Sequence, residues 1–207
     1  MPRKIRPLNR DGGKLRDARL MVIASEDTYA PKHYFSRFKM LRVDVQVYAT
    51  EDGKSSPRDV VARLDKFLDD NVTEDGDTFW LCIDRDRWPQ ETVEAAVRHC
   101  LDRGYGAAIS NPCFDLWVLL HFQDPPKDAV WTTCHEVEEH IRGKFNGYTK
   151  RCCRTLAMTR EAVERATERA RSADHSGATD LIPPPMVTHV YKILDVLLKE
   201  GQIVAFT

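Results

Sequence analysis

The stretch Thr78-Phe79-Trp80-Leu81-Cys82-Ile83-Asp84-Arg85-Asp86 places an acidic pair directly after an apolar run. A short apolar run that follows a turn-forming segment, here Glu74-Asp75-Gly76-Asp77, predicts a buried strand. Glu26 has the same setting, because it follows the apolar run Leu20-Met21-Val22-Ile23. Two buried strands that both end in carboxylates predict a concentration of negative charge at one edge of a sheet.

The pattern on either side of this stretch alternates strands with helices. Apolar runs and period-2 alternation predict strands at 20–24, 43–47, 78–83 and 105–109. Apolar spacing and helix-start prolines predict helices at 31–41, 57–68, 89–103 and 114–122. This order predicts an α/β fold with a mostly parallel central sheet and helices on both faces. Right-handed crossovers would then bring the carboxyl ends of the strands, with Glu26, Asp84 and Asp86, to one edge.

After Pro125-Pro126 the pattern becomes helical. Thr133 and Glu136 have the spacing of a capping box, and further helices are expected at 160–173 and 187–198. The chain therefore divides into a basic N-terminal arm (1–19), an α/β core (20–124) and a C-terminal helical extension (125–207) that we expect to pack on the core.

Composition favours a soluble globular protein, with 42% apolar and 30% charged residues. No apolar run reaches the roughly 20 residues that a membrane-spanning helix needs. The charged N-terminus lacks the apolar segment of a secretory signal. We therefore expect a cytoplasmic protein without membrane contact, in which Cys82, Cys100 and Cys113 are buried free thiols.

The net charge of −1 conceals an asymmetry. Residues 1–19 carry seven Lys/Arg against two Asp, and residues 142–171 carry nine Lys/Arg against three Glu. An acidic core between basic segments suits a metal site surrounded by a phosphate-binding surface. A solvated tail and a solvated helix face would explain the same charges.

Carboxylates at a strand edge suit a hard cation. Mg²⁺ prefers oxygen ligands and is commonly held by one or two carboxylates together with water and substrate phosphate. An Asp-x-Asp pair can supply two such ligands, and Glu26 from the neighbouring strand a third. We therefore predict Glu26, Asp84 and Asp86 as catalytic residues and as ligands of Mg²⁺ or Mn²⁺. An acidic turn is the alternative for the Asp pair alone.

Other residues could bind substrate. Asn111 and Asp115 stand at the start of the apolar block 110–122, where they either face the cleft or cap a core helix that contains His121. The basic stretch after residue 143, with Phe145 and Tyr148 interleaved, could hold single-stranded nucleic acid or be an exposed loop. The predicted substrate-binding residues are Arg85, Asn111, Asp115, Lys144, Lys150, Arg151 and Arg154. The sequence lacks a phosphate-binding P-loop, a dinucleotide-binding glycine motif and a nucleophile elbow.

The residues resemble those of the RloB-like family. The similarity lies in Glu26, in Ile83-Asp84-Arg85-Asp86, in the block from Ile109-Ser110-Asn111-Pro112-Cys113-Phe114 to Phe122, and in Val187–Leu194. The resemblance implies a Toprim-like fold over about residues 20–198. The sequence departs from the family pattern in the loop after Glu26, which lacks a glycine and a second Glu, and at Asp115, where Glu is common.

The resemblance also implies a function. In Toprim enzymes the strand-end Glu acts as general acid–base or metal ligand and the Asp-x-Asp pair binds Mg²⁺, which carries over to Glu26, Asp84 and Asp86. It implies a metal-dependent nuclease acting on RNA, with tRNA among the candidates, in bacterial antiphage defence beside an AAA-type ATPase. Homo-oligomerisation is left open. The alternatives are a non-catalytic module that binds nucleic acid or the ATPase, and a phosphatase or phosphotransferase acting on small molecules.

Overall fold

The computed structural model describes residues 18–51, 53–145, 148–150, 159–175, 180–200 and 202–206. The strands are β1 (Arg19–Ser25), β2 (Phe38–Leu41), β3 (Val43–Tyr48), β4 (Thr78–Asp84), β5 (Gly106–Asn111), β6 (Val187–Thr188) and β7 (Gln202–Phe206). The helices are α1 (Ala30–Phe35), α2 (Pro57–Asp70), α3 (Gln90–Asp102), α4 (Phe114–Leu120), α5 (Cys134–Lys144), α6 (Arg160–Ala173) and α7 (Val190–Glu200). None of these helices is long and apolar enough to cross a membrane.

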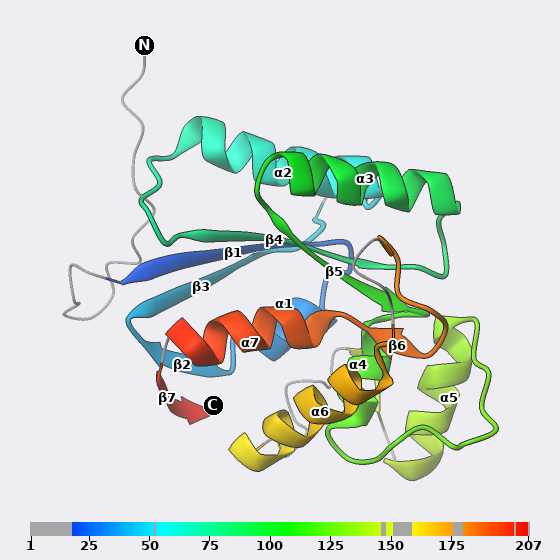
Figure 1. Ribbon diagram of the computed structural model, residues 1–207. Coiled ribbons are helices and arrows are strands. Elements are labelled where there is room, and N and C mark those ends of the chain that lie inside the picture. Colours follow the sequence, from blue (N-terminus) through cyan, green and yellow to red (C-terminus); the bar gives the residue numbers. More distant parts are fainter. Residues whose placement is uncertain are drawn as a thin grey trace.

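A five-stranded sheet in the order β3-β1-β4-β5-β6 forms the centre of the molecule. Its first four strands are parallel and only β6 is antiparallel. Helices α2 and α3 cover one face, while the other helices lie on the opposite side (Figure 1). The predicted α/β architecture, with a mostly parallel sheet and helices on both faces, is confirmed.

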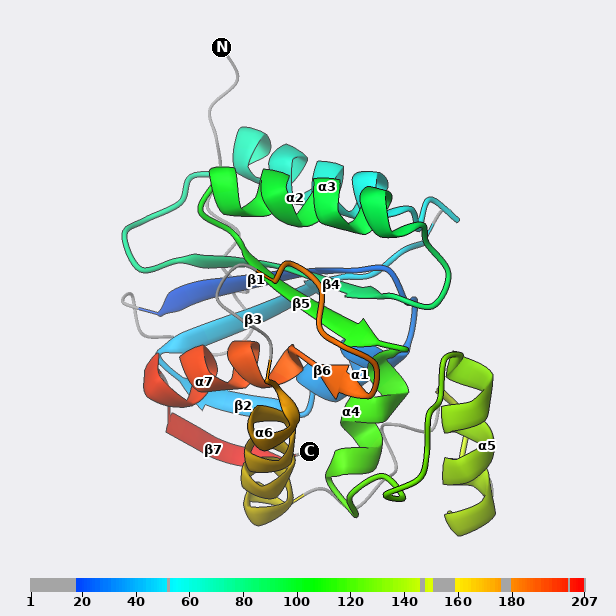
Figure 2. The same ribbon diagram turned by 45° about the vertical axis from the view of Figure 1, so that its right-hand side comes forward.

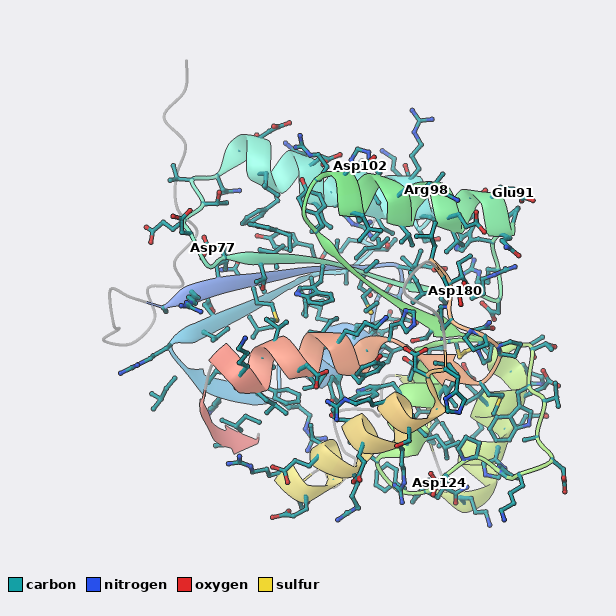
Figure 3. The ribbon with its side chains drawn as sticks, in the orientation of Figure 1. Asp77, Glu91, Arg98, Asp102, Asp124 and Asp180 are labelled. Atoms are coloured by element: carbon teal, nitrogen blue, oxygen red, sulfur yellow. A yellow bond between two sulfur atoms is a disulfide. The ribbon has the colours of Figure 1, made fainter. Side chains whose placement is uncertain are left out.

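Alternate residues of the central strands enter two separate apolar cores. Met21 and Ile23 of β1 join the core beneath α1, α4 and α7, while Leu20 and Val22 join the core beneath α2 and α3. Strands buried on both faces read as continuous apolar runs, which is why β1 and β4 were visible in the sequence. Figure 3 shows Glu91, Arg98 and Asp102 along α3, on the side of the sheet opposite α7.

The strand register brings the predicted acidic residues to one edge. Ser25, the last residue of β1, pairs with Cys82 of β4, and Asp84 at the end of β4 pairs with Ser110 of β5. Glu26 and Asp84 therefore leave adjacent strands at the same end of the sheet, as parallel topology requires.

The helix predicted over 31–41 is shorter than expected. α1 ends at Phe35, and Phe38–Leu41 forms β2, which pairs antiparallel with β7. Tyr34, Phe35 and Phe38 still lie in ring contact with one another, so the apolar spacing is satisfied by a short helix followed by a strand. The partner strand β7 lies at the other end of the chain, beyond the reach of local periodicity.

The C-terminal third is helical with two added strands. The capping box of Thr133 and Glu136 at the start of α5 is confirmed, and α6 has the predicted bounds. The last helix begins later than expected, at Val190, because Val187–Thr188 forms β6 against the end of β5. Figure 2 shows α5 beside α4 at the carboxyl end of β5. Residues 1–17 of the predicted basic arm lie outside the described residues.

Gly106 generates a first prediction. It pairs with Trp80, and a Cβ atom at position 106 would overlap the indole ring. Gly106→Ala should lower the free energy of unfolding by about 1–3 kcal/mol, because the ring or the strand must shift. The matched control is Gly143→Ala in α5, where a Cβ meets nothing within 4 Å. That change should stabilise the protein by about 0.5–1 kcal/mol. Equal urea-unfolding free energies for wild type and Gly106→Ala would refute the prediction.

His121 generates a second prediction, which concerns the pH dependence of stability. It is buried, its Nδ1–H donates to the Trp117 carbonyl (2.9 Å), and its Nε2 lies 3.2 Å from the Tyr34 hydroxyl. Burial lowers the pKa of His121 from 6.5 to about 4. Between these values only the unfolded chain takes up the proton, so stability present above pH 6.5 is lost as pH falls towards 4.

Urea unfolding at pH 7, 6 and 5 measures this loss. His121→Gln should weaken the pH dependence, whereas His135→Gln, which changes an exposed histidine of α5, should leave it intact. A pH dependence unchanged in His121→Gln would contradict the assignment.

Candidate active site

Glu26 lies directly after β1 and is almost fully buried, with 5% of its surface exposed. Its backbone N–H donates to the Cys82 carbonyl (3.1 Å), which holds this residue against β4. Its Oε2 accepts the backbone N–H of Asp84 (3.1 Å). The carboxylate of one strand end is therefore bound to the backbone of the next.

Asp84 is the last residue of β4 and is 7% exposed. Its Oδ1 accepts the N–H of Phe114, the first residue of α4 (2.9 Å). A carboxylate that accepts an unpaired N–H group at a helix start is favoured by hydrogen bonding and by the helix dipole. Asp84 thus joins the sheet edge to α4.

Asp86 extends the acidic edge towards α5. Its Oδ2 accepts the N–H of Cys134 at the start of α5 (3.0 Å), while its Oδ1 is buried without a hydrogen-bond partner. The backbone N–H groups of Arg85 and Asp86 donate to the Pro112 carbonyl (3.0 and 3.2 Å), which fixes this turn against the loop after β5.

Burial dominates the electrostatics of these acids. It raises the pKa of Glu26 above its usual value, and the charge of Asp86 adds to the effect while Arg87 opposes it. Burial raises the pKa of Asp84 well above its usual value, the charge of Lys150 opposes this, and the charges of Glu26, Asp27 and Asp86 act in the same direction as burial. A site of this kind binds either protons or cations.

A second group of acids lies beside the first, around Lys150. The Lys150 Nζ lies 3.2 Å from Asp27 Oδ2, 3.9 Å from Glu138 Oε1 and 4.0 Å from Asp115 Oδ2. Asp115 is fully buried, and burial raises its pKa to about 6 although Lys150 and the Tyr148 hydroxyl, 2.5 Å away, oppose this. Burial disfavours the charged form of Lys150, but the surrounding carboxylates more than offset it and raise its pKa.

These residues offer the oxygen ligands that Mg²⁺ prefers, but Glu26, Asp84 and Asp86 do not bring their ligand atoms as close together as two other groups do. The buried, unpartnered Oδ1 of Asp86 and the like-charged neighbours of Asp84 favour a hard cation such as Mg²⁺. Among the described residues, three ligand atoms lie within 4.8 Å of one another in two groups: Asp84 with Cys113 and Cys134, and Asp115 with Cys134 and Glu138. Glu26, Asp84 and Asp86 are neighbours without forming such a group, so this ligand set stays a prediction.

The predicted substrate-binding residues occupy different environments. The Arg85 guanidinium donates to the Trp88 carbonyl (2.6 Å), and the Asn111 amide donates to the Pro183 carbonyl (2.9 Å). Both residues therefore hold the protein's own backbone. Lys144 is exposed in the last turn of α5, and Lys150 lies among carboxylates. Arg151 and Arg154 lie outside the described residues.

The aromatic residues of the basic stretch do not form a platform for bases. Tyr148 is buried and donates to Asp115, and the Phe145 ring packs on Phe122 with centroids 4.6 Å apart. Stacking on Tyr148 requires an exposed ring face, so this interpretation of the sequence was wrong.

Two residues at the site were missed by sequence reasoning. The Arg87 Nη1 lies 3.7 Å from Glu26 Oε1, and the Arg87 side chain is 63% exposed. Its guanidinium is therefore a solvent-exposed cation next to the acidic residues at the sheet edge. Its position directly after the Asp pair was an available signal. No sequence signal pointed to Glu138 on α5, because its approach to Lys150 depends on tertiary packing.

The cysteines are partly as predicted. Cys82 and Cys100 are buried free thiols, but Cys113 forms a disulfide with Cys134. The prediction for Cys113 was wrong because the starts of α4 and α5 meet in space, which local apolar context does not reveal. The disulfide lies beside the amide that binds Asp86.

A third prediction concerns this disulfide. It joins residues 21 apart, and a cross-link closing a loop of this size stabilises a protein by about 3 kcal/mol in the chain-entropy model. Adding dithiothreitol should therefore lower the thermal midpoint of the wild type. Cys134→Ser supplies the control, since its midpoint should be lower from the outset and should not respond to the reductant. Equal responses of the two proteins would argue against the bond.

One family model, that of the RloB-like proteins, matches residues 21–197, from within β1 to within α7. The matched residues include Glu26, Asp84, Asp86 and Asp115. No curated protein and no solved structure is significantly similar to the chain. Because the family model covers most of its length, the chain belongs to the RloB-like protein family.

Proposed function

We propose that this protein is a Toprim-type nuclease that cleaves phosphodiester bonds of RNA, with tRNA among its candidate substrates, in a Mg²⁺- or Mn²⁺-dependent reaction. One observation carries the proposal. Glu26, Asp84 and Asp86 lie at the carboxyl edge of a parallel sheet, with raised carboxyl pKa values at the first two and an unpartnered buried oxygen at the third. Membership of the RloB-like family supports it.

The residues have separable roles in this proposal. Glu26, Asp84 and Asp86 would hold the metal, which when bound polarises a phosphoryl oxygen and activates water. Glu26, whose Oε2 accepts the Asp84 N–H, would use Oε1 as a general acid–base group. The exposed Arg87 guanidinium would bind a substrate phosphate.

The setting of the activity is also part of the proposal. We place the protein in the cytoplasm, in an antiphage defence system, with an AAA-type ATPase as the partner that the family resemblance suggests. The exposed Lys144 on α5, together with Arg151 and Arg154, would contact the phosphate backbone of the nucleic acid.

The fourth prediction tests catalysis. Purified protein incubated with tRNA, other RNA and DNA should cleave RNA in Mg²⁺ and lose the activity in EDTA. Glu26→Gln and Asp84→Asn should each reduce the cleavage rate about 10²–10⁴-fold, as expected for loss of an acid–base or charge-stabilising group. Asp75→Asn, in the exposed turn before β4, is the matched control and should retain full activity. Cleavage that persists in the Glu26→Gln/Asp84→Asn double variant would exclude this site.

A second candidate function has its own support. Each of the three carboxylates accepts a backbone N–H, and this gives them a structural role without a metal. A non-catalytic module that binds nucleic acid or an ATPase would use the same surface. RNA binding that is insensitive to EDTA, without cleavage under any metal condition, would favour this alternative.

A further inference from the structure

Lys150 is enclosed by three carboxylates from three different elements. Asp27 comes from the loop after β1, Asp115 from the first turn of α4 and Glu138 from α5, and all three have an oxygen within 4.0 Å of the Lys150 Nζ. The lysine side chain is only 28% exposed. Its ammonium group is therefore engaged with the protein, which leaves it poorly placed to bind a substrate phosphate.

The position of Lys150 coincides with a second potential metal site. Asp115, Cys134 and Glu138 are one of the two groups of ligand atoms that lie within 4.8 Å of one another in the described part of the chain. Both carboxylates of this group contact the Lys150 ammonium, and the Cys134 sulfur is bonded to Cys113. A divalent ion at this position would lie against a fixed charge of the same sign.

The burial of Asp115 favours a cation beside its carboxylate. Asp115 is fully buried, so its carboxylate has no water to offset its charge. Arg142 also pairs with Glu138, at 2.7 Å, but its side chain is 46% exposed. Lys150 is the more buried of the two cations and the one that also contacts Asp115 and Asp27.

We propose that Lys150 is a positioning residue that takes the place of a second metal ion, so that the site binds one divalent cation and not two. The inference rests on the proposed metal site at Glu26, Asp84 and Asp86. In this arrangement the ammonium holds Asp27, Asp115 and Glu138 together, its charge also acts on Asp84, and the single ion binds at Glu26, Asp84 and Asp86. Removal of the lysine charge would free the carboxylates of Asp27, Asp115 and Glu138 for metal.

The experiment counts bound Mn²⁺ per full-length chain by isothermal titration calorimetry, with electron paramagnetic resonance of free Mn²⁺ as a second measurement. Wild type and the charge-conserving Lys150→Arg should bind one ion. Lys150→Met and Lys150→Gln should bind two. Lys66→Met, which removes an exposed lysine paired with Asp70 on α2, is the matched control and should bind one.

The other possible outcomes separate a failure of this inference from a failure of the proposed function. Two ions on wild type, or one on a folded Lys150→Met and Lys150→Gln, would overturn the inference and leave the proposed nuclease intact. No ion on wild type would overturn both. If a neutral variant is destabilised, saturating Mn²⁺ should raise its thermal midpoint by more than that of wild type, because the second ion replaces the ammonium. Failure of Mn²⁺ to restore folding would also overturn the inference.

Discussion

The burial of several carboxylates at one edge of a parallel sheet is the constraint on which the rest of this structure depends. An isolated buried carboxylate costs several kcal/mol unless it is hydrogen-bonded or paired with a cation. Glu26, Asp84 and Asp115 are all nearly or fully buried, and a neighbouring carboxylate raises the pKa of each further: Asp86 for Glu26, Glu26 for Asp84, and Glu138 for Asp115. The fold must therefore bring hydrogen-bond donors and positive charge to this edge.

The donors are backbone N–H groups at the ends of secondary-structure elements. Glu26 accepts from the end of β4, Asp84 from the start of α4, and Asp86 from the start of α5. The N–H groups of Phe114 and Cys134 have no partner inside their own helices, so each of these two hydrogen bonds satisfies a donor as well as an acid. The acidic side chains thereby fix the places where α4 and α5 begin. Site and fold share the same bonds, and the Cys113–Cys134 disulfide holds these two helix starts together.

The sequence was sufficient for the features that depend on local pattern. Apolar runs located β1 and β4, and parallel topology then placed Glu26 and Asp84 at one edge, as observed. It was insufficient where partners are distant in the chain. Pairing of β2 with β7 and the meeting of Cys113 with Cys134 depend on tertiary packing. Lys150 was expected to face phosphate because charge in a sequence carries no direction, yet it lies among acids.

Charge and hydrogen bonding are separate contributions at this edge, and the choice of substitution determines which one is removed. An asparagine at position 84 keeps an oxygen that can accept the Phe114 N–H, but it removes the negative charge that attracts a cation. An alanine would remove both and leave a buried N–H at the start of α4 without a partner, which costs about 1–3 kcal/mol. The same reasoning applies to Glu26, whose amide variant can still accept from Asp84. The isosteric amides therefore isolate the electrostatic role of these carboxylates, while the fold that depends on their hydrogen bonds is retained.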